Sequence, residues 1–336
     1  MIWAITGGSG FLGLHLARRL LAAGHSVRSL DLERGDLAGV EARAGDIRRH
    51  DDVRWLAGGA DVLVHAAAAL PIRGSEQALR SVNVDGTRVV LDAAVEAGVR
   101  RAILVSSAVV YGLQPPPITE STRPAPIEAY GRTKLEAEQL WLARAPEPVI
   151  LRPTAFLGSG RLGVFGILFD WIRENRRIYT LGPGANRYQL LAVEDLVDAI
   201  LLAVERPVAG LTFNLGAARF GTVAEDLREL IEHAGSRSRV SGLPAGPARV
   251  ALGALALAGL SPLSAWHYRS ADKDVVFEIT AAEHRLEWKP RFSNGETLGG
   301  AFDWYVANRA ALRRAGGRTH RTPWRQKALG LARRLS

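Results

Sequence analysis

Residues 107–134 contain three side chains that together could support the transfer of a hydride and a proton. Tyr130 and Lys134 stand four residues apart in "EAYGRTKLEAE", which reads as the start of a helix. Residues at this interval share one helix face, with their Cβ atoms about 5–6 Å apart. Ser107 ends the apolar run "RRAILVSS", which is typical of a buried strand. Taken alone, the Tyr–Lys pair also fits two exposed polar neighbours on an amphipathic helix.

The chemistry that these residues could perform is alcohol oxidation or ketone reduction, in which a proton moves on the oxygen together with the hydride. A free phenol has a pKa of about 10, too high for a base near neutral pH. We expect the Lys134 ammonium to lie about 4 Å from the Tyr130 phenol and to stabilise the phenolate by at most about 4 kcal/mol, or roughly 3 pK units. Ser107 would orient the substrate oxygen by a hydrogen bond.

A glycine motif stands where a dinucleotide cofactor would bind. The apolar strand "MIWAIT" leads into "GGSGFLG" and then into the helical pattern "FLGLHLARRLLAAG". Strand, glycine turn and helix in this order allow the backbone to approach a pyrophosphate at the helix N-terminus. Gly8, Gly10 and Gly13 fit one spacing of the motif, and Gly7 can replace Gly8 in another. The predicted cofactor contacts are Gly7, Gly10, Phe11, Leu12 and Gly13.

An acidic residue ends the second predicted strand, "HSVRSLDL". Asp31 lies 18 residues after Gly13, where a carboxylate accepts hydrogen bonds from the adenosine ribose. Because the 2′-phosphate of NADP would meet this carboxylate, NAD is favoured as the cofactor. Arg34 stands near enough to leave NADP as the alternative. A loop carboxylate that faces water is the other interpretation of Asp31.

Further candidate cofactor contacts follow the next predicted strands. Asp46, after "VEARAG", could accept a hydrogen bond from the adenine amino group. His65 ends the strand "ADVLVH", and we expect it to pack beside the cofactor rather than to titrate in catalysis. Strands alternating with helices predict an α/β protein with a Rossmann-type, doubly wound parallel sheet, whose ligands bind beyond the carboxyl ends of the strands. The other candidates at these ends are Ile47, Ala66, Ala67 and Ser106.

Composition and charge limit the classes of function. The chain of 336 residues has no cysteine, which excludes thiolate catalysis, disulfides and Cys-ligated metals, and no metal site is predicted. Its net charge of +9 comes from residues 304–336, which contain nine Lys and Arg and no Asp or Glu. The body is neutral, which argues against a nucleic-acid partner. "MIWAITGGSG" has no basic n-region, so we expect a cytoplasmic protein without a secretory signal.

Nine segments of residues 1–216 resemble, in the expected order, the extended short-chain dehydrogenase/reductase family. They are "TGGSGFLG", "GDI", "VHAAA", "NVDGT", "SSAVVYG", "YGRTK", "LRPTAFLG", "AVEDLVDAI" and "FNLG". The resemblance implies that Ser107, Tyr130 and Lys134 form the catalytic set. It also implies that Asn83 supports the active site and that Pro153 borders the nicotinamide.

The resemblance also implies a division of the chain. Seven parallel strands would form the NAD-binding domain, and a smaller, mostly helical C-terminal domain would bind a small-molecule substrate. The expected NAD-binding domain is 1–157, with 187–215 returning to it; the substrate domain is 158–186 and 216–313. A homodimer would form through helices at 75–97 and 128–145.

The C-terminal half must select the substrate. Tyr188 and Gln189 stand where nucleotide-sugar members of the family have an Arg-Asp pair for a diphosphate. An apolar helix at 249–263 resembles the insertion of the 3β-hydroxysteroid dehydrogenase-like branch, and burying an apolar chain gains about 0.8 kcal/mol per CH₂. The favoured function is an NAD-dependent oxidoreductase of a lipophilic, sterol-like or long-chain alcohol or ketone. The alternative function is that of a nucleotide-sugar 4-epimerase or dehydratase. The alternative role of the apolar helix is that it only caps its domain.

The basic tail at 314–336 has an amphipathic pattern. A helix there would place Trp324, Ala328, Leu331 and Leu335 on one face, with basic residues over much of the rest. Such a helix could lie on an anionic membrane surface. A disordered end and a contact with a neighbouring subunit are the alternatives. A catalytically silent NAD-binding scaffold is disfavoured because the Ser-Tyr-Lys set is intact.

Overall fold

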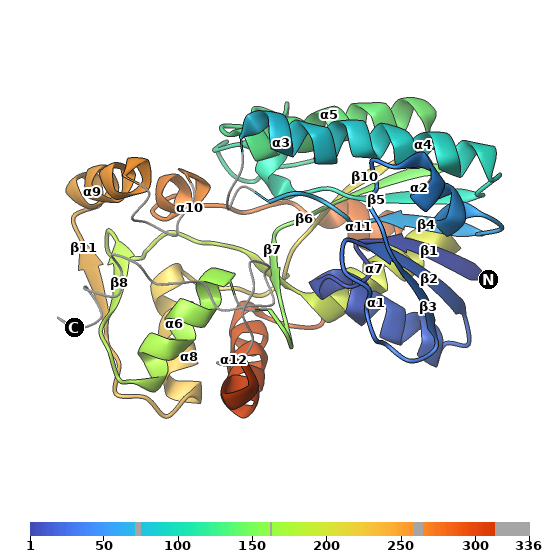
Figure 1. Ribbon diagram of the computed structural model, residues 1–336. Helices are drawn as coiled ribbons and strands as arrows, with labels where there is room; N and C mark the ends of the chain where they lie inside the picture. The colour runs from blue at the N-terminus through green and yellow to red at the C-terminus, as the bar shows by residue number, and fades with distance from the viewer. Residues whose placement is uncertain (71–74, 162, 259–264, 313–336) are drawn as a thin grey trace.

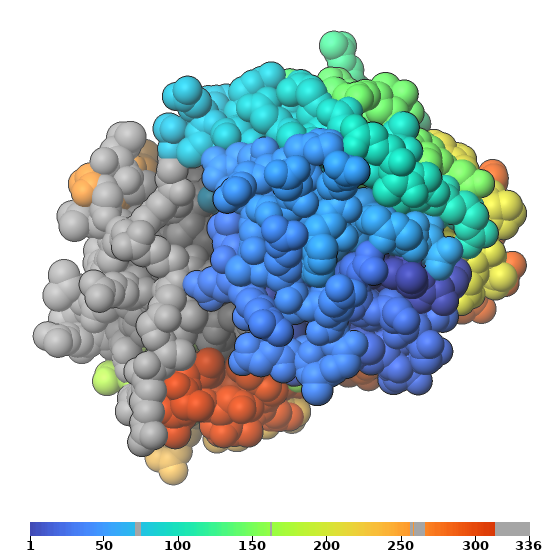
Figure 2. Space-filling view, turned by 45° about the vertical axis from the view of Figure 1, so that its right-hand side comes forward, coloured from blue at the N-terminus to red at the C-terminus, as the bar shows by residue number. Residues whose placement is uncertain are grey.

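The chain forms a large sheet flanked by helices and a smaller, mostly helical part beside it, as the computed structural model shows (Figure 1). The structure describes residues 1–70, 75–161, 163–258 and 265–312. The predicted basic tail helix therefore lies outside the described residues. The N-terminal residues, in blue and cyan, form much of the surface in Figure 2.

Seven strands form the large sheet in the order β10-β6-β5-β4-β1-β2-β3, and every neighbouring pair is parallel. The order reverses beside β1, as in a doubly wound fold, so the predicted fold class is confirmed. All residues of β4 and β5 are buried, because helices cover both faces of a parallel sheet. The strands are β1 (Ile2–Thr6), β2 (Ser26–Asp31), β3 (Val40–Ala44), β4 (Val62–His65), β5 (Arg101–Val105), β6 (Pro148–Pro153) and β10 (Thr212–Leu215).

Two hydrophobic cores cover the faces of this sheet. On one face, α1 (Phe11–Ala22) and α7 (Val193–Glu205) pack against the strands. On the other face lie α2 (His50–Ala57), α4 (Gly86–Glu96) and α5 (Ala129–Arg144). Both helix layers thus hold the strand ends, and the loops that follow them, along one edge of the sheet.

Residues 279–288 pack on the sheet, although the predicted substrate domain includes them. This segment contains α11 (Thr280–Arg285). The buried side chains of Ala282 and Trp288 join the core formed by α1 and α7. The Trp288 indole Nε1 donates to the backbone oxygen of Asp195, at 2.9 Å. The chain therefore crosses back to the sheet once more before α12.

The helical pattern at 75–98 is interrupted. The chain forms α3 (Glu76–Arg80), a π-helical turn η1 (Ser81–Asp85) and then α4. Such wide turns inside helices often occur at functional sites, because they redirect a side chain. This turn contains Asn83, one of the predicted site residues.

The smaller part is built mainly of helices. α6 (Gly163–Arg173), α8 (Val223–His233) and α12 (Asn294–Leu312) surround their own hydrophobic core. Two short strand pairs border them, and α10 (Ala265–Ser270) lies beside α9. These pairs are β8 (Ile178–Leu181) with β11 (Val240–Leu243), and β7 (Ala155–Leu157) with β9 (Leu190–Ala192). A mostly helical C-terminal part is therefore confirmed.

The predicted apolar helix lies earlier in the chain than expected. α9 spans Ala245–Leu257 rather than 249–263, and residues 259–264 lie outside the described part of the chain. Val250, on α9, is 74% exposed. Of the helices that the structure describes, none has the length and apolar character needed to cross a bilayer.

Candidate active site

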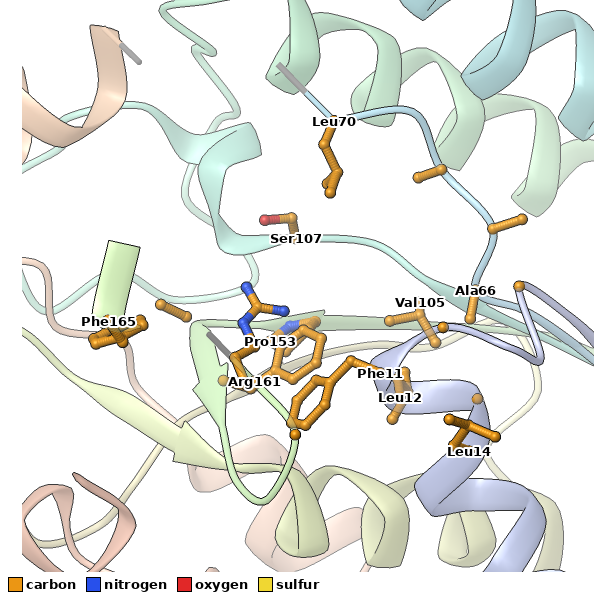
Figure 3. Close-up of a pocket in the computed structure, with 18 of the residues that line it drawn as sticks. Phe11, Leu12, Leu14, Ala66, Leu70, Val105, Ser107, Pro153, Arg161 and Phe165 are labelled. Atoms are coloured by element: carbon orange, nitrogen blue, oxygen red, sulfur yellow. The ribbon is translucent and has the colours of Figure 1, made fainter. Parts of the chain in front are cut away.

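A cavity of about 1630 Å³ runs along the carboxyl ends of the strands and continues between the two parts of the molecule (Figure 3). Sixteen of the eighteen predicted site residues line it, and His65 and Asn83 do not. We call the end of the cavity that is lined by the glycine loop, Asp31 and Asp46 the cofactor half. We call the end that is lined by residues of α6 and α10 the substrate half. The sixteen are Gly7, Gly10, Phe11, Leu12, Gly13, Asp31, Arg34, Asp46, Ile47, Ala66, Ala67, Ser106, Ser107, Tyr130, Lys134 and Pro153.

The glycines of the loop at residues 7–13 are packed too closely to carry side chains. Gly7 has a φ of +73°, and a Cβ on it would lie 2.9 Å from the backbone nitrogen of Ala67. A Cβ on Gly13 would lie 2.4 Å from the Gly7 oxygen. Helix α1 has no side-chain cap at its N-cap Gly10 and no acidic residue in its first turn. Its first N–H groups thus offer a site for an anion, which fits a pyrophosphate.

Asp31 is held rigidly at the end of β2. Its Oδ2 accepts from the Ser9 backbone nitrogen at 3.0 Å, and its Oδ1 accepts from Leu32 at 2.7 Å. Burial raises the pKa of Asp31, and these N–H donors act in the opposite direction. The carboxylate is therefore pre-oriented at the cavity, as ribose recognition requires. Arg34 is exposed and lines the same half.

Asp46 has a partner that the sequence analysis did not consider. The side chain of Arg48 donates through Nε to the Asp46 carboxylate at 3.0 Å, and this contact lowers the pKa of Asp46. The Asp46 backbone nitrogen in turn donates to Asp52 at 3.0 Å. Asp46 is therefore a fixed acceptor at the cavity, and Arg48 lines the cavity beside it.

His65 lies away from the cavity, which corrects its predicted place beside the cofactor. Its ring nitrogens hydrogen-bond the hydroxyls of Thr6 at 2.7 Å and Thr87 at 2.9 Å. Its ring stacks on Trp141, with the centroids 5.6 Å apart. Burial lowers the pKa of His65 to about 3, so the imidazole is neutral at physiological pH. The last side chain of β4 thus points into the helix layer rather than to the strand edge.

Asn83, which the family resemblance gives as a support of the active site, does not line the cavity. Its amide nitrogen donates to the Thr133 hydroxyl at 3.0 Å and to the Ala69 oxygen at 3.1 Å. Its oxygen accepts from the Ala69 nitrogen at 2.7 Å. Because Thr133 stands between Tyr130 and Lys134 on α5, Asn83 fixes that helix to the loop after β4. It is a positioning residue.

Ser107, Tyr130 and Lys134 all line the cavity. The Lys134 Nζ donates to the backbone oxygen of Val105 at 2.9 Å, and burial lowers its pKa to about 8. The Ser107 Oγ accepts weakly from the Val109 nitrogen at 3.4 Å. The Lys134 contact joins α5 to the end of β5, and Ser107 lies two residues after that strand.

The electrostatics of the tyrosine differ from the expectation. Burial raises the pKa of Tyr130 to about 12, and the cation that opposes this shift is Arg161, not Lys134. The Lys134 ammonium donates to the Val105 carbonyl, and loss of solvent around the buried phenol is the main cause that raises the pKa of Tyr130. The structure thus does not give Tyr130 a pKa near neutrality.

Arg161 was missed by the sequence analysis. It follows "RPTAFLGSG", the segment expected to border the nicotinamide, and this position was the available signal. Its guanidinium lies 4.8 Å from the Phe156 ring centroid and 5.5 Å from that of Phe11. Figure 3 shows it pointing into the pocket on the side of Ser107. Burial lowers the pKa of Arg161 to about 10, so it stays charged at neutral pH.

A buried polar network supports the catalytic candidates from behind. Glu138, one turn after Lys134 on α5, accepts from the Ser106 hydroxyl and pairs with Arg152 at 2.6 Å. Arg152 also donates to the Tyr111 hydroxyl at 2.7 Å, which donates to Asn214 at 2.8 Å. The Glu138 charge opposes the lowering of the Lys134 pKa. This network joins β5, β6, β10 and α5.

The substrate half is largely apolar, but α9 does not form it. None of the side chains that the structure describes on α9 lines the cavity; α10 contributes Trp266 and His267 instead. The Trp266 indole donates to the Tyr188 hydroxyl at 3.1 Å. Burial lowers the pKa of His267 to about 4, so it is neutral. Apolar side chains lining this half include Val164, Phe165, Leu168, Leu190, Leu227 and Val275.

Residues 188 and 189, where an Arg-Asp pair was expected in nucleotide-sugar enzymes, form structural hydrogen bonds here. The Gln189 side chain donates to the Ala217 oxygen at 2.7 Å and accepts from the Phe277 nitrogen at 2.9 Å. Tyr188 is hydrogen-bonded to α10 through Trp266. These two positions therefore hold the substrate half together, where nucleotide-sugar enzymes were expected to place a charged pair.

The fold and the cavity define an enzyme of the extended short-chain dehydrogenase/reductase type, with a dinucleotide site at the strand ends. The chain belongs to the NAD dependent epimerase/dehydratase family, whose model matches residues 3–216. NAD is the cofactor in the description of that family, and the glycine loop and Asp31 fit it.

Individual proteins extend the comparison beyond the family match. An uncharacterized protein of Sinorhizobium fredii is 37% identical over 97% of this chain and 84% of its own length. The human sterol-4-alpha-carboxylate 3-dehydrogenase, decarboxylating, is 32% identical over 60% of this chain and 57% of its own length. A solved UDP-glucose 4-epimerase of Thermotoga maritima superposes with a TM-score of 0.77, over 92% of this chain and 99% of that chain, at 22% identity.

Proposed function

We propose that this protein is an NAD-dependent oxidoreductase that transfers a hydride between NAD(H) and a secondary alcohol or ketone of a lipophilic, sterol-like or long-chain substrate. The observation that carries the proposal is the apolar substrate half, which opens directly beside Ser107, Tyr130 and Lys134. Burying an alkyl chain there gains about 0.8 kcal/mol per CH₂.

The cofactor half would hold NAD through its backbone and two carboxylates. The first N–H groups of α1, around Gly10, Phe11 and Leu12, would bind the pyrophosphate. Asp31 would accept from the adenosine ribose, and Asp46 from the adenine. Bound NAD⁺ supplies the hydride acceptor, while this chain's residues position the reacting carbon near Pro153.

The proton would move through Tyr130. In alcohol oxidation its phenolate would accept the proton of the substrate hydroxyl, and in ketone reduction its phenol would return it. The Ser107 hydroxyl would hydrogen-bond the same oxygen and orient it. Because burial raises the pKa of Tyr130 to about 12, the phenolate needs the positive charges of this site, and Arg161 supplies one.

The relatives support an oxidoreductase of a lipophilic substrate. The human relative is described as a 3-dehydrogenase of a sterol carboxylate. The UDP-glucose 4-epimerase supports only the fold, because it shares 22% of its residues with this chain. A nucleotide-sugar epimerase or dehydratase, in which the hydride returns to the substrate, is the alternative.

The experiment is an incubation with NAD and three panels: 3-hydroxysterols, long-chain secondary alcohols and UDP-sugars. We expect the absorbance of NADH to rise with a lipophilic alcohol. Tyr130→Phe should abolish this rise and leave NAD binding, measured by calorimetry, intact. Interconversion of a UDP-sugar without net NADH would overturn the proposal in favour of the epimerase.

The assembly and location belong to the same proposal. We expect a cytoplasmic homodimer that pairs through α4 and α5, where Val95 and Leu142 are 56% and 46% exposed. Light scattering of the purified protein tests the dimer. Flotation with anionic vesicles, with and without residues 314–336, tests the membrane contact of the tail. A monomer, or flotation that does not depend on the tail, would contradict these two expectations.

A further inference from the structure

Arg161 carries a charge that the described part of the chain does not neutralise. No carboxylate forms an ion pair with it there, and no hydrogen bond of its guanidinium is present among the same residues; its contacts are the rings of Phe11 and Phe156. Ring faces attract a cation, but they do not satisfy its N–H donors. An arginine held this way in a cavity wall is prepared for an anion.

The acidic residues of the cavity are occupied elsewhere. Asp31 accepts from two backbone N–H groups, and Asp46 is paired with Arg48. Asp226 accepts from the side chain of Asn294 and from the backbone of Gly221. These bonds hold the three carboxylates, and the exposed Glu33 and Asp36, which also line the cavity, follow β2 in the cofactor half and form no ion pair with Arg161. The anion for Arg161 must therefore come from a bound molecule.

Glu128 and His267 complete the titratable neighbours. Glu128 precedes α5, and the charges that act on it are those of Arg269 and Arg132 rather than Arg161. His267 is neutral at physiological pH, since burial and the Arg161 charge lower its pKa. Neither group supplies an anion that meets the guanidinium.

Arg161 stands where the two halves of the cavity meet. Its guanidinium lies against the rings of Phe11, in the glycine loop, and Phe156, and its charge acts on Tyr130 and His267. Arg18, Arg34 and Arg48 line the cofactor half, together with the N-terminus of α1. The cofactor phosphates thus have their own site, away from the tyrosine.

The number of cations in the substrate half indicates which kind of anion Arg161 would bind. Among the described residues that line the substrate half, Arg161 is the arginine present, and Lys134 is bound to a strand carbonyl. A diphosphate usually meets several cations. One planar guanidinium instead matches one carboxylate, through two parallel N–H···O bonds.

We propose that Arg161 binds a carboxylate of the substrate, a few bonds from the hydroxyl that Tyr130 deprotonates. The substrate class is then a lipophilic hydroxy acid, with its apolar body in the substrate half and its carboxylate on Arg161. This inference rests on the proposed oxidoreductase function for the identity of the reacting group, but not for the binding of the carboxylate.

Matched acids and esters test the proposal. The probes are 3-hydroxyhexadecanoate and a 3-hydroxysterol with a carboxylate on the neighbouring ring carbon, each compared with its methyl ester. Binding to the NAD-loaded protein is measured by calorimetry, and turnover by NADH absorbance. We expect an acid of the panel to bind about 10- to 100-fold more tightly than its ester, as charge-assisted hydrogen bonds do.

Three variants identify the residue. Arg161→Gln should remove the preference for the acid and leave ester and NAD binding unchanged. Arg161→Lys should restore part of the preference, which a merely structural role would not require. Arg269→Gln is the matched control, because Arg269 is exposed on α10 and does not line the cavity. The Arg269→Gln variant should prefer the acid over the ester as strongly as the wild-type protein does.

Two kinds of result would overturn the inference, and a third would overturn only the proposed function. Equal binding of acid and ester, or no binding of either in the panel, contradicts a carboxylate site. A loss of NAD binding in Arg161→Gln, with the acid preference intact, assigns Arg161 to the cofactor. Acid binding that depends on Arg161 without NADH formation would uphold the inference and contradict the oxidoreductase, so the two can fail separately.

Discussion

The cofactor half and the substrate half of the cavity are built in different ways. In the cofactor half, the glycine loop packs closely against neighbouring backbone, and the carboxylates of Asp31 and Asp46 accept hydrogen bonds from nearby N–H groups. In the substrate half, side chains from α6, α10 and other distant segments meet over an apolar surface. One half is therefore determined by the sheet, and the other by how helices far apart in sequence pack.

This difference teaches where selectivity can change. Backbone positions at a parallel sheet edge tolerate little variation, since any added atom meets other backbone. Side chains on packed helices can change one at a time without disturbing the sheet. We therefore expect substitutions in the cofactor half to act on NAD binding or folding, and those in the substrate half to act on the substrate.

The largest effect on NAD binding should follow Gly13→Ala. Its Cβ would lie 2.4 Å from the Gly7 oxygen, so the loop or α1 must move. We expect a loss of stability of about 1–3 kcal/mol, as overpacking causes, and at least a tenfold loss of NAD affinity. Thermal unfolding and calorimetry measure the two. Gly246→Ala, at an uncrowded position in α9, is the control. An unchanged NAD affinity in Gly13→Ala would contradict the claim that substitutions in the cofactor half act on NAD binding.

Glu138→Gln should have its main effect on stability, and it tests the support shared by both halves. It leaves Arg152 buried with a neutral partner, and breaking a buried ion pair costs about 3–5 kcal/mol. Because the Glu138 charge raises the pKa of Lys134, its removal should lower that pKa below about 8. Urea unfolding measures the first effect, and the alkaline limb of the activity profile the second. A stable variant with an unshifted limb would show that the network is dispensable.

The contrast between the halves also explains what could be predicted from the sequence. The glycine loop, Asp31 and the Tyr130–Lys134 pair are short patterns within one strand–helix unit, so spacing alone placed them at the cavity. The structure places His65 elsewhere than expected because strand residues alternate between the two faces of a sheet. The sequence pattern of one strand does not show which face its last side chain takes.

Arg161 and α10 could not be found in this way. Arg161 lies against Phe11, and Trp266 of α10 is hydrogen-bonded to Tyr188. These contacts join segments far apart in the sequence, which the spacing of neighbouring residues does not predict. The pKa of Tyr130 likewise depends on burial and on Arg161, neither of which the four-residue spacing reveals. The apolar run at α9 predicted an apolar substrate site, but none of the side chains that the structure describes on α9 lines the cavity.

A smaller effect should follow Asp31→Asn, which sharpens the role of the cofactor half. The carboxylate would no longer repel a 2′-phosphate, and the ratio of NADP to NAD affinity should rise about tenfold, as for one charged hydrogen bond. Calorimetry with each dinucleotide measures the ratio. Substrate selectivity should not change. A changed acid-to-ester preference in this variant would mean that the halves are coupled.

The acid stability of the protein should depend partly on His65. Its pKa is about 3 in the folded chain, below the ordinary 6.5, so the unfolded state binds more protons between these values. Stability should therefore fall as the pH falls from about 6.5 towards 3, by at most about 1.4 kcal/mol per pH unit for this group. His65→Gln should show a shallower fall in urea titrations at several pH values, and an unchanged slope would contradict this.

The smallest effect should follow Trp266→Phe, which removes a single hydrogen bond of the substrate half. The donor to the Tyr188 hydroxyl at 3.1 Å is lost, while an aromatic ring stays against the cavity. One such bond is worth about 0.5–1.5 kcal/mol, so KM for a lipophilic substrate should rise several-fold and the NAD affinity should not change. Tyr188→Phe removes the acceptor and should give the same change, with no further loss in the double variant. A shift in NAD affinity instead would mean that α10 serves the cofactor, and that the division of the cavity is wrong at this point.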